Sequence, residues 1–116
     1  MENLLIYHNP KCSKSRKTLE ILKSKGLNPQ IILYLEKKLT SDELKSLLKK
    51  LKISVRELLR TTEKEFNEKN LGKKNLSDNE IIKIMSNCPK LIQRPIVVFG
   101  SKAVIARPPE KVYEII

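Results

Sequence analysis

Cys12 is the residue of this chain best placed to act as a nucleophile. It lies in a polar stretch between a short apolar run, Leu4–Tyr7, and a segment with helical spacing that begins near Ser15. The N-terminus of a helix presents unbonded N–H groups and a partial positive charge, which both favour a thiolate over a thiol. We therefore expect a lowered pKa for Cys12 and attack by its thiolate. The alternative, a cysteine that fills a gap in the core, is disfavoured by the polar neighbours.

His8 and Ser15 are candidates for tuning this sulfur. Ser15 comes three residues after Cys12, where its hydroxyl can turn back toward the sulfur. His8 is the only histidine, and near a thiolate it can act electrostatically or as a proton donor. A simple turn residue is the alternative for His8. Lys11, Lys14 and Arg16 add positive charge nearby.

Cys88, the second cysteine, is not placed to form a local redox pair with Cys12. Ser15 occupies the position where a Cys-x-x-Cys motif would have its second cysteine. We expect Cys88 to be an incidental, half-buried residue at a helix end. A mechanism with one cysteine therefore needs a thiol from outside, such as glutathione.

Three arginines, Arg60, Arg94 and Arg107, stand beside expected breaks in secondary structure. The planar guanidinium binds oxyanions better than the lysine ammonium does. In a thioredoxin-like fold the loop before the third strand lies against the redox loop, so Arg94 and Pro95 should face Cys12, with Pro95 in a cis peptide. Each arginine alone could be a surface residue, but with a thiolate the three would form an oxyanion site.

The elements that must position these residues follow from apolar periodicity and capping signals. Strands are expected where short apolar runs occur, at 4–7, 31–35, 96–99 and 103–106, the last two joined by a turn at Gly100 and Ser101. Helices are expected from Ser15 to a stop at Gly26, after Thr40–Ser41, after Ser54, from Ser77 to Cys88, and from Pro108 to Ile116; residues 61–76 are irregular or weakly helical.

This order defines the expected fold class. It is α/β and thioredoxin-like, with β-α-β and β-β-α halves and a helical insertion at about residues 40–90. We expect residues 1–116 to form a single domain of this kind.

Composition narrows the class of protein further. With 116 residues, 40% of them hydrophobic, the chain should fold rather than stay disordered. No apolar run approaches the ~20 residues of a membrane helix, and the start of the chain lacks the layout of a signal peptide. Two cysteines are too few for a disulfide scaffold. We expect a soluble, reduced, cytoplasmic monomer without membrane contacts.

The net charge of +11 is typical of proteins that bind nucleic acids. However, the lysines are spread through the expected helices, and only three tyrosines and two phenylalanines are available to stack on bases. Nucleic-acid binding is therefore disfavoured, and a general preference for anionic ligands is the better interpretation.

From about Leu5 to Ile116 the sequence resembles the glutaredoxin-coupled, glutathione-dependent arsenate reductase family. The matching stretches occur in the family's order and spacing: His8–Arg16, Ile31–Leu35, Ser54–Arg60, Arg94–Val98 and Ala106–Glu110. The chain stops directly after the last expected helix, as in members of the family that lack a C-terminal extension.

The resemblance implies a thioredoxin-like fold and reduction of arsenate to arsenite, with glutathione as co-substrate, glutaredoxin as partner and no bound cofactor or metal. By the family pattern Cys12 is the nucleophile and forms a thioarsenate. His8 and Ser15 match the positions that tune the thiolate. The oxyanion is bound by Arg60, Arg94 and Arg107.

Two other functions remain open. A glutathione-dependent thiol or disulfide reductase of the same superfamily would keep Cys12 but would not need all three arginines. A non-enzymatic thiol-stress regulator that binds RNA polymerase shares the fold, but many such proteins carry Cys-x-x-Cys, and this chain has Ser15 at the second position.

Overall fold

The computed structural model describes residues 3–69 and 75–116, and the chain forms two compact units. The first contains the chain up to Lys37 and from Arg94 onward, and the second is Lys38–Gln93. The prediction of a single domain with an insertion at about residues 40–90 stays a prediction. Part of the stretch 61–76, namely residues 70–74, lies outside the described residues.

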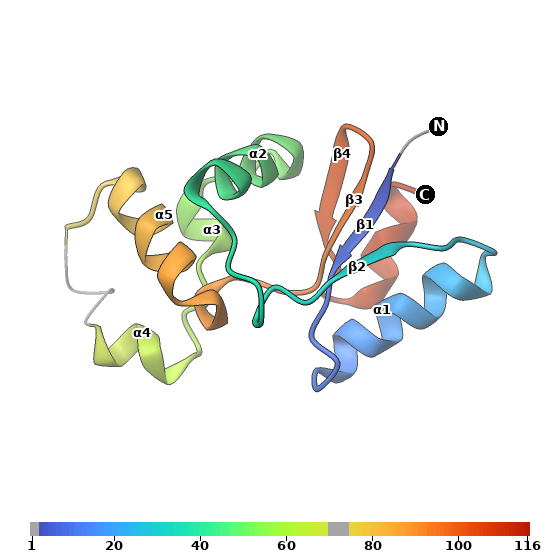
Figure 1. The fold of residues 1–116 in the computed structure, drawn as a ribbon, viewed down its shortest axis with the longest axis horizontal. Coiled ribbons are helices and arrows are strands. Elements are labelled where there is room, and N and C mark those ends of the chain that lie inside the picture. The colour runs from blue at the N-terminus through green and yellow to red at the C-terminus, as the bar shows by residue number, and fades with distance from the viewer. Residues whose placement is uncertain (1–2, 70–74) are drawn as a thin grey trace. The chain divides into compact units, whose positions relative to one another are not determined.

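The first unit is built on a four-stranded sheet with the order β2-β1-β3-β4 (Figure 1). Strand β2 pairs parallel to β1, whereas β1 with β3 and β3 with β4 pair antiparallel. The elements of this unit are β1 (Leu4–Tyr7), α1 (Ser13–Ser24), β2 (Gln30–Ile32), β3 (Ile96–Phe99), β4 (Lys102–Ile105) and the 3₁₀ helix η2 (Pro109–Glu114). This is the β-α-β and β-β-α arrangement of the predicted thioredoxin-like fold.

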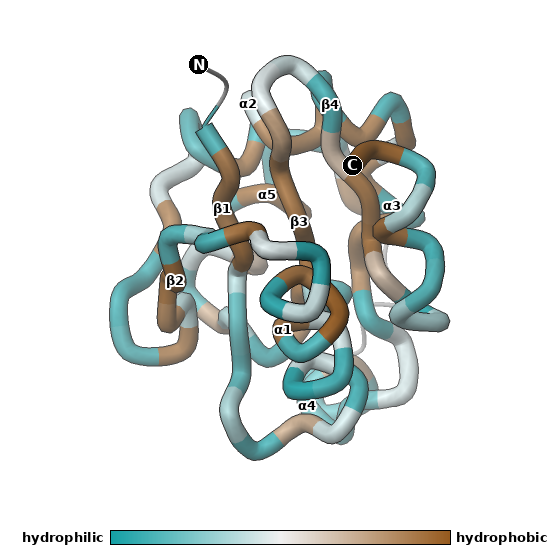
Figure 2. Tube along the Cα trace, turned by 90° about the vertical axis from the view of Figure 1, so that its right-hand side faces the viewer, coloured by the Kyte–Doolittle hydropathy of each residue, from teal (hydrophilic) through white to brown (hydrophobic). Residues whose placement is uncertain are grey.

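The core of the first unit lies where α1 and η2 contact the central strands. Ile6 of β1 and Val97 of β3 are fully buried, together with Leu22 of α1 and Val112 of η2. Figure 2 shows hydrophobic residues along β1 and β3, the two central strands of the sheet. Each of these side chains contributes about 1.5–3 kcal/mol through removal from water, so α1 is held firmly against the sheet.

The second strand differs from its prediction. It covers Gln30–Ile32 instead of residues 31–35. The carbonyl of Leu33 accepts hydrogen bonds from the N–H groups of Glu36 and Lys37, so the chain turns there and leaves the sheet. An apolar run alone could not reveal this turn, because Tyr34 is buried although it lies outside the strand.

The last segment also differs, since Pro109–Glu114 forms a 3₁₀ helix rather than an α-helix. Two further boundaries shift slightly. Helix α1 begins at Ser13, and β4 runs from Lys102 to Ile105 instead of 103–106.

The second unit is helical. It contains α2 (Ser41–Leu51), α3 (Val55–Leu58), α4 (Lys64–Glu68), α5 (Asp78–Asn87) and the 3₁₀ helix η1 (Pro89–Leu91). The predicted N-caps are confirmed: Thr40 and Ser77 each form a complete capping box, and Ser54 accepts a hydrogen bond from the Glu57 N–H. Leu44 of α2, Ile81 and Met85 of α5 are buried in this unit.

Within residues 3–69 and 75–116, no helix combines the length and apolar character needed to cross a membrane.

Candidate active site

Strand pairing brings several loops of the first unit to one end of the sheet. Tyr7, the last residue of β1, lies opposite Ile96, the first residue of β3, and Ile96 in turn lies opposite Ile105 at the end of β4. The His8 N–H donates to the Ile32 carbonyl over 2.8 Å. The loop after β1 therefore lies beside the segment before β3 and the segment after β4, as the thioredoxin-like fold predicts.

Cys12 is the N-cap residue of α1, with extended backbone angles of φ −95° and ψ 122°. The Cys12 N–H donates to the Asn9 carbonyl over 3.0 Å, and the Cys12 carbonyl accepts from the Arg16 N–H over 3.0 Å. The side chain is half-buried. Its side chain forms no capping hydrogen bond, but it stands at the position from which an N-cap side chain meets the N–H groups of the first helical turn.

The thiol of Cys12 has a pKa below its ordinary value. Burial raises this pKa, but the N–H groups of Ser15 and Lys14 and the guanidinium of Arg94 lower it by more. Each of these donors interacts more favourably with a thiolate than with a thiol. The predicted thiolate at a helix N-terminus therefore has a physical basis in the donors around the sulfur.

Arg94 and Arg107 lie together beside the cysteine loop. The Arg94 side chain interacts with the Cys12 sulfur. The Arg107 Nη1 donates to the Arg94 carbonyl over 3.3 Å, and the Ala106 N–H donates to the Pro95 carbonyl over 2.9 Å. The predicted cis peptide at Arg94–Pro95 is confirmed, and Arg107–Pro108 is also cis.

Arg60 belongs to the second unit, and its contacts with Leu91 and Glu63 lie within that unit. Its N–H donates to the Leu91 carbonyl, and its Nε lies 3.1 Å from a carboxylate oxygen of Glu63. The structure thus places Arg94 beside Cys12 and Arg107 against the Arg94 carbonyl, and the places of Arg107 and Arg60 in the site stay predictions.

His8 and Ser15 form a buried polar pair. His8 Nδ1 lies 2.6 Å from Ser15 Oγ, and the Asn9 N–H donates to the same oxygen over 3.0 Å. The exposed fractions are only 6% for His8 and 0% for Ser15, so both polar groups depend on these bonds. The Ser15 hydroxyl, which could have turned toward the sulfur, bonds His8 and Asn9, and it is the Ser15 N–H that lowers the Cys12 pKa. The prediction that Ser15 tunes the thiolate stays a prediction.

The imidazole of His8 is not a source of positive charge. Burial lowers its pKa, and the positive charges of Arg16 and Lys23 lower it further. A pKa below 6.5 leaves the ring mainly neutral at pH 7, so a cationic His8 is disfavoured there, and its influence on Cys12 stays a prediction.

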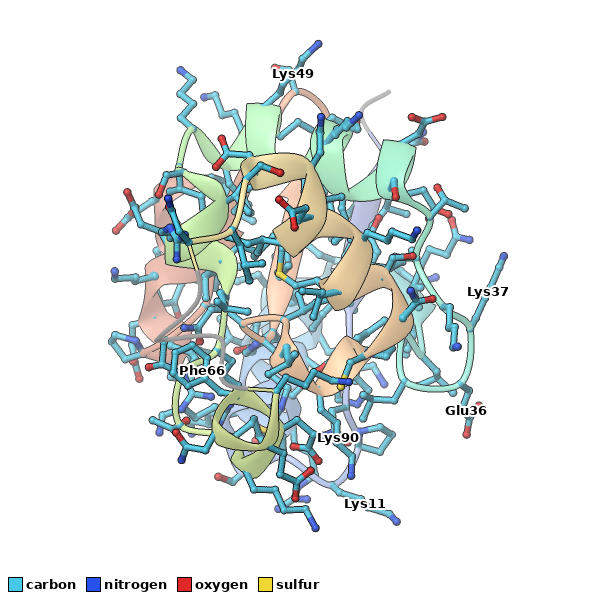
Figure 3. The ribbon with its side chains drawn as sticks, turned by 90° about the vertical axis from the view of Figure 1, so that its left-hand side faces the viewer. Lys11, Glu36, Lys37, Lys49, Phe66 and Lys90 are labelled. Atoms are coloured by element: carbon cyan, nitrogen blue, oxygen red, sulfur yellow. The ribbon has the colours of Figure 1, made fainter. Side chains whose placement is uncertain are left out.

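Two residues of the cysteine loop have contacts that the sequence analysis missed. The Asn9 Oδ1 accepts a hydrogen bond from the Lys11 N–H over 3.1 Å, and the Arg16 Nη1 donates to the Pro10 carbonyl over 2.8 Å. The Asn-Pro dipeptide was a usable signal for the first contact, since asparagine before proline favours a turn closed by its side chain. The Lys11 side chain points away from the protein (Figure 3).

Both cysteines of the chain are described and both are free. Cys88 ends α5 as its C-cap, and its exposure is intermediate, as expected for a helix-end residue. Among the described residues, no group of three or more His, Cys, Asp or Glu side chains could hold a metal ion.

The sheet order, the helix that follows β1 and the thiol at the N-terminus of that helix define a protein of the thioredoxin-like class. Comparison with known sequences narrows this class. The model of the ArsC family matches residues 7–115, and the chain belongs to that family.

Relatives of the chain agree with this assignment. It is 49% identical to an arsenate reductase of Haemophilus influenzae over 98% of this chain and 99% of that protein. It is 44% identical to an arsenate reductase of Escherichia coli strain K12, over the whole of this chain and 82% of that protein. A solved arsenate reductase from Vibrio cholerae matches with a TM-score of 0.96 and 47% identity, covering 99% of this chain and 98% of that one.

Proposed function

We propose that this protein reduces arsenate to arsenite, with Cys12 as the nucleophile that attacks arsenic. The observation that carries the proposal is the contact between the Arg94 side chain and the Cys12 sulfur, next to Arg107. A disulfide reductase would use the lowered thiol pKa, to which the Arg94 guanidinium contributes, but it has no use for a second guanidinium beside Arg94. The names of the full-length relatives support arsenate as the oxyanion.

The arginines address the main electrostatic difficulty of this reaction. A thiolate and an arsenate ion are both negative, so their approach is repulsive. Guanidinium groups bind tetrahedral oxyanions through paired N–H donors and also stabilise the charge that develops as the S–As bond forms. Arg94 can do both, because it already interacts with the sulfur. Arg60 is proposed as a third contact to the oxyanion.

The proposed reaction uses glutathione and a glutaredoxin as reductants. The Cys12 thiolate displaces one arsenate oxygen, which leaves as water after protonation, and forms an S–As(V) bond. The thiol of glutathione displaces a second oxygen in the same way. A glutaredoxin thiolate then attacks the glutathione sulfur and forms a mixed disulfide, leaving the electron pair on arsenic. Water finally releases arsenite and the Cys12 thiol, so two thiols supply the two electrons.

The chain has no second cysteine in the loop after Cys12, and Cys88 belongs to the other unit. This supports an external thiol as resolving partner. We place the reaction in the cytoplasm, where glutathione is abundant and thiols stay reduced. No bound cofactor is needed, because glutathione acts as a co-substrate.

The test is arsenite formation by the purified protein with arsenate, glutathione and glutaredoxin, with each component omitted in turn. We expect activity only in the complete mixture and none with Cys12→Ser. Cys88→Ser is the matched control and should remain active. Arsenite formation by the complete mixture without the protein, or by Cys12→Ser, would overturn the proposal.

A parallel assay separates the proposal from its main alternative. The same protein is given a small disulfide in place of arsenate, again with glutathione. A glutathione-dependent disulfide reductase would turn over the disulfide and ignore arsenate. Arg107→Ala would then leave its rate unchanged, because Arg107 is not among the groups that lower the thiol pKa, whereas an arsenate reductase should lose activity with that variant.

A further inference from the structure

Asn9 makes hydrogen bonds through its N–H, its carbonyl and its side chain to other residues of the cysteine loop and of α1. Its N–H donates to Ser15 Oγ over 3.0 Å, its carbonyl accepts from the Cys12 N–H over 3.0 Å, and its Oδ1 accepts from the Lys11 N–H over 3.1 Å. The first contact joins it to the buried His8–Ser15 pair. The other two fix the chain immediately before the nucleophile.

We propose that the Asn9 side chain is a positioning residue that holds the cysteine loop, so that the Cys12 sulfur stays over the N–H groups of the first turn of α1. This inference deepens the proposed function and rests on Cys12 being its nucleophile. Asn9 touches neither the sulfur nor the substrate in this role. It acts through the backbone of Lys11 and Cys12.

The physical argument begins with the backbone. Proline at position 10 restricts Asn9 to extended conformations, so the chain reaches Pro10 in one orientation. The Oδ1 bond then closes a turn over Lys11, and the carbonyl bond closes the next turn over Cys12. Only the first of these bonds depends on the side chain. Without it, the exposed residues Pro10 and Lys11 keep only main-chain restraints and the contact from Arg16.

Loosening the loop should affect the Cys12 thiol by changing the distance between its sulfur and the N–H groups of α1. The N–H groups of Lys14 and Ser15 belong to α1, which is fixed by its buried side chains, whereas the sulfur belongs to the N-cap residue that ends the loop. A wider range of loop conformations places the sulfur farther from these donors for part of the time. Because the donors favour the thiolate, the thiol should become a weaker acid.

The experiment measures the rate of Cys12 alkylation by iodoacetamide as a function of pH, in a Cys88→Ser background so that one thiol reacts. We expect Asn9→Ala to shift the midpoint of this profile upward, with a loss of about threefold to tenfold in rate at neutral pH, as suits the loss of one neutral hydrogen bond. Asn9→Ser keeps an oxygen that can accept from the Lys11 N–H, so its shift should be smaller.

Asn28→Ala is the matched control. Asn28 also precedes a proline, but it lies before the start of β2 and lines a cavity with Asn3 and Leu4, at the opposite end of the sheet from Cys12. Its alkylation profile should equal that of the parent protein. Melting temperatures of all variants, measured alongside, separate loss of folding from a change at the thiol.

The outcomes distinguish this inference from the proposed function. An ordinary midpoint in the parent protein would remove the thiolate nucleophile, and both proposals would fail. A lowered midpoint in the parent that Asn9→Ala leaves unchanged would overturn the role of Asn9 alone. Equal shifts in Asn9→Ala and Asn9→Ser, or a shift in Asn28→Ala, would also overturn it, because the effect would not then depend on the acceptor oxygen over Lys11.

Discussion

The Nδ1 atom of His8 lies 2.6 Å from Ser15 Oγ, and this contact joins the end of β1 to the first turn of α1. The two residues flank the loop that carries Cys12, and their hydrogen bond holds the two ends of this loop together. Both side chains are buried, so neither can replace its partner with bulk water. The pair therefore helps to hold the loop together, and its effect on the thiol stays a prediction.

Removal of the Ser15 hydroxyl should lower stability without removing the thiolate. Ser15→Ala leaves the buried His8 Nδ1 and the Asn9 N–H without their shared oxygen, at a cost of about 1–3 kcal/mol in the free energy of unfolding. The Ser15 N–H that faces the sulfur remains. Urea unfolding checks the first effect, with Ser24→Ala on the same helix as a control, since the Ser24 hydroxyl bonds only a carbonyl on its own helix. Equal costs for the two variants would contradict the prediction.

The reactivity of Cys12 should depend on pH in the manner of an acidic thiol. Because its folded pKa is lowered, the thiolate fraction at pH 7 is larger than that of an ordinary cysteine, and the loss of thiolate with falling pH is shifted to lower pH. We expect the midpoint of the alkylation profile to lie below about 8.5, the value of a free thiol. Unfolding in denaturant should move the midpoint back to that value. A rate that still rises steeply through that pH in the folded protein would contradict the lowered pKa.

The two cysteines should differ completely in their importance for activity. Cys12→Ser replaces the thiolate with a hydroxyl that does not ionise at neutral pH, so arsenite formation should be abolished. Cys88→Ser changes a half-buried residue at the end of α5, and activity should stay within about twofold of the parent protein, as is usual away from a reacting centre. The opposite pattern would mean that the reactive sulfur is Cys88.

Arg94 should matter for arsenate far more than an exposed lysine does. Arg94→Ala removes a charged donor beside the sulfur, and we expect kcat/KM for arsenate to fall by about tenfold or more, the usual loss for a hydrogen bond to a charged group. Lys49→Ala removes the same charge from the exposed surface of α2 and should have little effect (Figure 3). Arg94→Lys keeps the charge but not the planar fork, and should recover only part of the activity.

Equal losses for Arg94→Ala and Lys49→Ala would show that arsenate is attracted by the overall charge of +11 rather than bound at a site. Raising the ionic strength provides an independent check, because diffuse attraction weakens strongly with salt.

Local signals predicted much of this structure. Ser54 and Ser77 were identified as N-caps from their types and from the acidic residues that follow, and both accept the expected bonds. The position of Cys12 before a helix was visible for the same reason. A cap depends only on residues within one turn, so the sequence alone contains the information.

Features that depend on distant contacts were less accessible. The direction of the Ser15 hydroxyl could not be predicted, because its partner His8 lies seven residues away and either partner was possible. The end of β2 depends on a turn at Leu33, which no glycine or proline marks. Arg60 was grouped with Arg94 and Arg107 because all three stand beside expected breaks in secondary structure. Its side chain forms an ion pair with Glu63, and its place in the site stays a prediction.

The pairing of Tyr7 with Ile96, and of Ile96 with Ile105, makes the geometry around Cys12 depend on the packing of the hydrophobic core. Strand side chains alternate between faces, so sliding β3 by one residue would turn Val97 out of the interior. The same slide would carry Arg94, two residues before that strand, out of alignment with the thiol. The packing of buried aliphatic side chains thus fixes the strand register that holds the Arg94 guanidinium near the Cys12 sulfur. Mutations that loosen this packing should impair arsenate reduction before they unfold the chain.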